Sequence, residues 1–193
     1  MRLVDSVGHD NWAFDLEWSP DGKYLAACMF WHDWGSTTFY LFSFDGTDLE
    51  VVETWQPGNA QLAVDWSPDG KYIAISGYFS DPLRIYSFDG NGTTFVTSYR
   101  CSSIETLEWS PDGKYIAISG WLSSTEKFAV LSFNGTALTK VDSRQHYRGA
   151  NEVDWSPDGD RIAVASYYSD VELIIYSFNG TALEEDWSMD KGA

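Results

Sequence analysis

The sequence feature that most constrains this chain is a motif that occurs four times, as WSPDGKYLAAC, WSPDGKYIAIS (twice) and WSPDGDRIAVA. The copies begin at Trp18, Trp66, Trp109 and Trp155, so they are 48, 43 and 46 residues apart. Self-similarity at this period is typical of proteins that build one small unit several times and stack the copies. We therefore expect a single repeat domain over residues 1–193.

Each copy contains the signals of four short β-strands. The first strand ends at the Trp of the motif, and Ser-Pro-Asp-Gly supplies the tight turn after it. The second strand is KYIAIS or its equivalent, the third ends in LFSF, IYSF or VLSF, and the fourth follows an Asp-Gly or Asn-Gly turn. No segment has a convincing helical period. The pattern predicts an all-β fold, a β-propeller of four-stranded antiparallel blades with four blades per chain.

The motif WSPDGKYIAIS resembles the blade signature of WD-repeat and TolB-like β-propellers, and the resemblance covers almost the whole chain. The chain departs from that pattern in two places. Ser-Phe replaces the Trp-Asp pair that would end the third strand, as at Ser87-Phe88. The Gly-His element before the first strand occurs once, as Gly8-His9, with a lone His146 at the matching place in the fourth copy. Propellers carry many unrelated functions, so the resemblance implies the fold more strongly than the function.

Two histidines have an aspartate at a matching distance. His9 lies nine residues before Trp18 and Asp33 fifteen residues after it, and His146 and Asp170 repeat this spacing around the fourth motif. In WD-repeat blades an equivalent His–Asp pair ties two loops together, so the resemblance implies a structural role for both pairs. No serine or cysteine nucleophile stands out beside them, and no HExxH, CxxC, Walker or GxSxG pattern is present. The sequence therefore predicts a protein that is not an enzyme and uses no cofactor.

The four copies differ mainly in the loops between blades and in the connections between second and third strands. Both sets of loops are expected on one face of the propeller, and they are rich in aromatic residues. Such residues anchor proteins and peptides, and they also stack on sugar rings. We expect a protein or peptide partner on this face, with a glycan as the alternative. The candidate ligand-binding residues are Trp12, Trp31, His32, Trp34, Tyr78, Phe79, Trp121, Tyr147, Tyr167 and Tyr168.

An acidic residue precedes the Trp of every motif on the strand expected to line the central channel. Converging carboxylates can hold Ca²⁺ or another hard cation. Side chains of this strand are expected to point mainly at neighbouring blades, and each motif carries a cation within reach in sequence, at Lys23, Lys71, Lys114 or Arg161. No metal site is therefore predicted at the row of Glu17, Asp65, Glu108 and Asp154.

The charge of the chain bears on its partners and location. A formal net charge of −17 disfavours nucleic acid and anionic membranes, because phosphate binding requires Lys and Arg. No apolar run approaches the roughly 20 residues of a membrane span, and MRLVDSVGHD lacks the apolar centre of a signal peptide. These features predict a cytoplasmic protein.

The two ends of the sequence both match the fourth strand of a blade. Residues 2–6, RLVDS, align with TKVDS at 139–143, so a strand at 2–7 is expected to be available to close the ring. The segment TALEEDWS at 181–188 already supplies a fourth strand for the last blade. The resemblance implies about six to eight blades per ring. We expect a homodimer that completes an eight-bladed ring, with a self-closed four-bladed monomer or a fragment of a longer array as the alternatives.

Overall fold

The computed structural model describes residues 12–30, 38–55, 61–77, 81–145, 150–166 and 171–190. Within these ranges the chain forms β-strands, turns and connections without a helix, which confirms the all-β prediction. The described part of the chain contains no helix that meets the length and hydropathy of a membrane span.

Sixteen strands in the described ranges form four antiparallel sheets, each of four strands in chain order and each built from one copy of the repeat. These sheets are the blades. Blade 1 consists of β1 (Trp12–Trp18), β2 (Tyr24–Phe30), β3 (Phe39–Phe44) and β4 (Leu49–Trp55). Blade 2 consists of β5 (Gln61–Trp66), β6 (Tyr72–Gly77), β7 (Leu83–Phe88) and β8 (Thr93–Tyr99). Blade 3 consists of β9 (Thr106–Trp109), β10 (Tyr115–Ser119), β11 (Glu126–Phe133) and β12 (Leu138–Gln145). Blade 4 consists of β13 (Ala150–Trp155), β14 (Arg161–Ser166), β15 (Val171–Phe178) and β16 (Leu183–Asp190).

The Ser-Pro-Asp-Gly turn has the same hydrogen bonds wherever it occurs. In blade 2 the Ser67 hydroxyl donates to Asp69 over 2.7 Å and accepts the backbone N–H of Tyr72 over 2.9 Å. Gly70 has a φ of 70°, a left-handed conformation that glycine adopts without steric cost. This turn fixes the register between first and second strands, which explains why its residues recur in all four copies.

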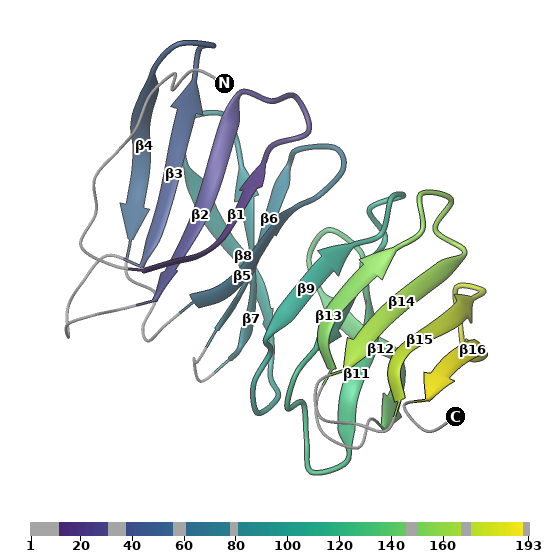
Figure 1. Cartoon of the computed structure of the whole chain (residues 1–193). Coiled ribbons are helices and arrows are strands. Elements are labelled where there is room, and N and C mark those ends of the chain that lie inside the picture. Colours follow the sequence, from purple (N-terminus) through teal and green to yellow (C-terminus); the bar gives the residue numbers. More distant parts are fainter. Residues whose placement is uncertain are drawn as a thin grey trace.

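The blades lie side by side in an arc, with blade 1 at one end and blade 4 at the other (Figure 1). The first strands β1, β5, β9 and β13 are neighbours along one side of the arc. Strand β16 pairs with β15, so residues 183–190 occupy the fourth position of the last blade, as the alignment of 181–188 predicts. The expected additional strand at 2–7 lies outside the described residues.

The hydrophobic core lies between blades rather than inside one sheet. Separate clusters join blade 1 to blade 2, blade 2 to blade 3, and blade 3 to blade 4. The motif residues Trp66, Trp109 and Trp155 belong to these clusters and are only 3–5% exposed. Each blade is thus stabilised by its neighbours, as expected for a repeat architecture.

Candidate functional site

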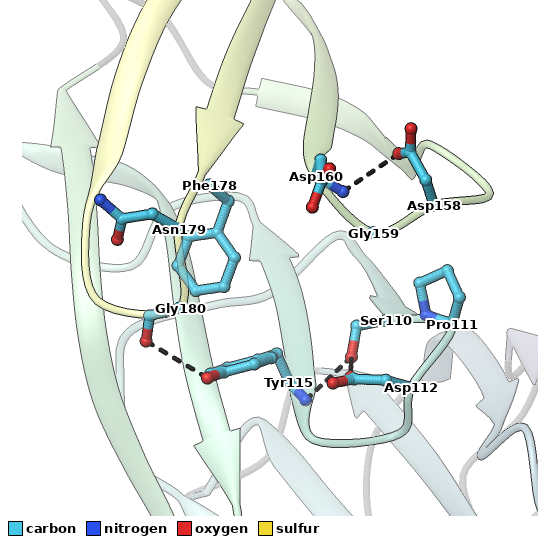
Figure 2. A pocket seen from close by; sticks show the side chains of 10 residues that line it. All are labelled: Ser110, Pro111, Asp112, Tyr115, Asp158, Gly159, Asp160, Phe178, Asn179 and Gly180. Atoms are coloured by element: carbon cyan, nitrogen blue, oxygen red, sulfur yellow. Dashed lines mark hydrogen bonds between the residues drawn. The ribbon is translucent and has the colours of Figure 1, made fainter.

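A pocket of about 450 Å³ lies where the turns of blades 3 and 4 meet (Figure 2). The Tyr115 ring lies beside Phe178, and its hydroxyl donates to the carbonyl of Gly180 over 3.2 Å. A similar pocket lies between blades 1 and 2, where Tyr24 donates to the carbonyl of Gly90 over 3.1 Å. Because the same residue types line both pockets, they are a general feature of a blade junction rather than a specific ligand site.

Two of the carboxylates that precede the motif tryptophans reach the next blade. Asp65 accepts the backbone N–H of Trp109 over 2.6 Å, and Glu108 accepts that of Trp155 over 2.5 Å. In addition, the indole N–H groups of Trp66 and Trp155 donate to the backbone carbonyls of Glu17 and Glu108, each over 3.2 Å. These bonds join the first strands of successive blades.

The environment of these carboxylates disfavours their charge. Burial raises the pKa of Asp65 to about 7 and that of Glu108 to about 8, and the hydrogen bonds from the tryptophan N–H groups offset this only in part. Burial also raises the pKa of Glu17, and the nearby Asp15 adds to the effect. The row is thus a set of partly buried acids with a role in joining blades.

The described residues contain no group of three or more His, Cys, Asp or Glu side chains that could hold a metal ion. The lysines that follow the first three motifs contact the aspartate of the turn instead. Lys71 and Lys114 pair with Asp69 and Asp112 over 2.9 Å, whereas Arg161 lies 3.4 Å from Asp186.

Trp121 lies on the opposite side of the blades from the turns, in the connection between β10 and β11, and its side chain is 51% exposed. The Lys127 ammonium lies 4.0 Å from the centre of its ring and donates to the carbonyl of Ser123 over 2.7 Å. Lys127 itself is buried, and the neighbouring Leu122 is buried in the core. Of the two neighbouring residues, Leu122 thus belongs to the core and Trp121 is exposed. The cation–π contact with Lys127 holds the Trp121 indole in place.

The backbone around Trp121 is tightly constrained. The carbonyls of Trp121 and Leu122 accept the N–H groups of Ser103 and Ser102 over 2.9 and 3.0 Å. Gly120 has a φ of 142°, and a Cβ atom there would lie 2.8 Å from the backbone nitrogen of Glu105. Only glycine fits, so this connection presents Trp121 on a rigid support.

The other predicted ligand residues are placed as follows. Trp12 begins β1 of blade 1 and is 63% exposed, whereas Trp121 belongs to blade 3. The remaining candidates lie outside the described residues: Trp31, His32, Trp34, Tyr78, Phe79, Tyr147, Tyr167 and Tyr168. Both His–Asp pairs also lie outside them, with His9, Asp33, His146 and Asp170.

Sequence reasoning missed two surfaces at the ends of the arc. Large apolar side chains of β1 are exposed at one end: Trp12, Phe14, Leu16 and Trp18. Trp187 and Met189 of β16 are exposed at the other. The alternating aromatic and aliphatic residues of β1, and a tryptophan in the last strand where other copies have polar residues, were the available signals.

Comparison with solved structures finds the same fold in larger proteins. A candidate 6-phosphogluconolactonase from Bacteroides uniformis matches with a TM-score of 0.78 and 21% identity over 92% of this chain and 55% of its own. The periplasmic gluconolactonase PpgL of Pseudomonas aeruginosa matches with a TM-score of 0.73 and 18% identity, over 92% and 57%. Sqt1 from Chaetomium thermophilum matches with a TM-score of 0.72 and 19% identity, over 88% and 44%. The chain thus spans about half the length of these proteins.

These likenesses, at such identities, show the fold alone, and they correct one prediction. The sequence-based conclusion that the chain is not an enzyme is wrong, because proteins named as gluconolactonases share the fold. The absence of familiar nucleophile and metal motifs does not exclude catalysis in such a fold.

Family models agree with the repeat and the blades. The search of curated proteins found no matching relative. The model of the WD domain, G-beta repeat, matches residues 2–39, which confirms the resemblance to WD repeats. The model described as eukaryotic translation initiation factor eIF2A matches residues 32–190, well over half of the chain. With four propeller blades and a family match of that extent, the chain belongs to the eIF2A family.

Proposed function

We propose that this chain is a binding module that holds a protein or peptide partner and acts as a scaffold. The supporting observation is Trp121, a half-exposed indole whose position is set by Lys127 and by a glycine-dependent backbone. A rigid, exposed tryptophan on a loop is the kind of residue that dominates protein interfaces. The charge of −17 favours a protein over a nucleic acid, and the family description makes translation initiation the process in which to seek the partner.

The test compares two exposed aromatic residues in the same chain. Trp121→Ala is expected to weaken partner capture from a host extract at least about tenfold, as loss of an interface hot spot does. Phe95→Ala is the matched control, because Phe95 is 55% exposed but lies on the outer strand β8, away from the loop. Equal capture by Trp121→Ala and the wild type would refute the proposed surface. Binding to a glycan array that Trp121→Ala abolishes would assign the glycan alternative.

We also propose that the working module is a closed ring built from two copies of the chain. The apolar side chains at both ends of the arc support this, since soluble proteins rarely expose contiguous apolar patches. Light scattering after size exclusion is expected to give twice the chain mass of 21.8 kDa. A folded species at 21.8 kDa at every concentration would contradict the two-copy ring.

A further inference from the structure

The first end of the arc exposes a surface that every other blade buries. We call it the N-face, formed by Leu16 and Trp18 of β1 and the partly buried Leu25 of β2. Ala27, which pairs with Leu16, is already buried in the single chain beside Met29 and Phe42. Trp18 is 42% exposed and Leu16 52%. Their equivalents in blade 2, Trp66 and Val64, are both 3% exposed because blade 1 covers them.

The last end exposes the complementary surface, the C-face. Two cross-strand rows form it: Ala163, Ile175 and Trp187, and Ala165, Leu173 and Met189. In blade 1 the equivalent residues of the two inner strands are fully buried against blade 2: Ala26, Cys28, Phe39 and Leu41. In blade 4 all four inner positions are partly exposed, as are Trp187 and Met189. The inner positions of the C-face are thus those that receive the next blade at an internal junction.

We propose that the N-face of one copy binds the C-face of the other in the geometry of the three internal junctions. This inference rests on the proposed two-copy ring and specifies how its seams are made. A two-fold axis then relates two identical seams, each with one N-face and one C-face. The repeat equivalence assigns the contacts within each seam.

The first assigned contact joins the inner strands. At two internal junctions the carboxylate before one motif accepts the backbone N–H of the next motif tryptophan. Asp154 is the equivalent carboxylate in blade 4, and Trp18 is the equivalent tryptophan in blade 1. The N–H of Trp18 is therefore expected to donate to the partner's Asp154.

The second assigned contact is an ion pair, which no internal junction shows among the described residues. At the first and third junctions a tyrosine, Tyr24 or Tyr115, packs on the last phenylalanine of the third strand in the next blade and donates to a turn carbonyl. In blade 4 the equivalent residue is Arg161. Its guanidinium group can both pack on a phenylalanine ring and donate a hydrogen bond to a carbonyl. The part of blade 1 that it would meet is a depression lined by Phe44, by three acids, Asp45, Asp48 and Glu50, and by Lys23, Tyr24 and Ser43. The three acids outnumber the one cation there.

The acid at position 48 is specific to blade 1. The equivalent residues of the other copies are Gly92, Ala137 and Ala182. Blade 4, with an arginine where the other three copies have a tyrosine, thus faces the one copy with this additional acid. Such complementary charge favours the head-to-tail pairing of unlike ends over the pairing of like ends, particularly in a chain of charge −17.

The test blocks each face separately and then mixes the two variants. Leu16→Glu places a charge on the N-face, and Ala163→Glu fills a C-face position at which the internal junctions have fully buried alanines. Both sites are partly exposed in the single chain, so the fold should survive, which circular dichroism checks. Each variant alone is expected at 21.8 kDa under conditions in which the wild type has twice that mass. Phe95→Glu, away from both faces, is expected to remain dimeric.

An equimolar mixture of the two variants contains one intact N-face and one intact C-face. It is therefore expected to form dimers again, at least about tenfold weaker than the wild type because one seam of two remains. A mixture that stays monomeric, or either variant dimeric alone, would overturn the head-to-tail seam while leaving the two-copy ring to stand. A monomeric wild type would instead overturn the ring itself.

A charge reversal provides a second test should either variant fail to fold. Arg161→Glu and Asp48→Arg are each expected to weaken the dimer, and the double variant to recover at least half of the lost affinity. If the double variant is no tighter than either single one, the assigned ion pair is wrong.

Discussion

Trp18 and Trp66 occupy the same place in two copies of one motif, yet their environments differ. Both pack against the phenylalanine that ends the third strand of their own blade, with ring centres 5.4 and 5.2 Å apart. Trp66 is 3% exposed and Trp18 is 42% exposed. The motif determines the blade, whereas burial depends on whether another blade precedes it. Comparing the two positions therefore measures how much a neighbouring blade contributes to the free energy of unfolding at this site.

The largest expected difference is in the cost of removing the two indoles. Trp66→Ala should lower the free energy of unfolding by about 3–5 kcal/mol, as loss of a buried aromatic residue does. Trp18→Ala should cost at most about 1.5 kcal/mol in a dilute, monomeric sample, because water already reaches the ring. Urea titrations at protein concentrations too low for dimers to form measure both free energies of unfolding. Equal costs would mean that the N-face is covered in the single chain.

A smaller difference is expected between two glycines with left-handed backbones. A Cβ atom at Gly120 would meet backbone atoms of residues 103–105, whereas none lies within 4 Å of one at Gly22. Gly120→Ala should therefore cost about 2–4 kcal/mol, and Gly22→Ala about 1 kcal/mol from backbone strain alone. Thermal unfolding compares the two. A mild effect at Gly120 would show that the connection carrying Trp121 can move.

The smallest effect concerns the acids that join blades. Burial raises the pKa of Asp65 to about 7, so the folded chain holds a proton that the unfolded chain loses near its ordinary pKa. Stability should therefore fall as pH rises from about 4 to about 7. Asp65→Asn keeps an oxygen for the Trp109 N–H and should be about 1–2 kcal/mol more stable than the wild type at pH 8, with no gain near pH 4. Measuring the free energy of unfolding of both proteins at several pH values tests this. The prediction is contradicted if the free energy varies with pH in the same way for Asp65→Asn as for the wild type.

Most of the fold could be predicted because its determinants are local. The tryptophan, the Ser-Pro-Asp-Gly turn and the alternating second strand lie within one motif, so each copy specifies its own blade. The individual bonds of the acids before each motif could not be predicted in this way, since Asp65 and Glu108 bind residues 44 and 47 positions away in the next blade.

The candidate surfaces were harder to predict because they depend on contacts between segments. Trp121 was expected near the loop rim, but the burial of Lys127 beneath it was not, because a lysine in an alternating strand normally indicates solvent. The exposure of the N-face depends on the number of neighbouring blades, which the repeat does not encode. Such features follow from the assembled arc.

The most direct test of the account is the mass of the wild-type chain in solution beside that of Ala163→Glu. Light scattering after size exclusion should give twice 21.8 kDa for the wild type and 21.8 kDa for the variant, because a glutamate cannot fit where the seam requires a buried alanine. A wild type that stays folded at 21.8 kDa across dilution, or an Ala163→Glu variant that keeps the wild-type mass, would contradict the pairing of the two ends.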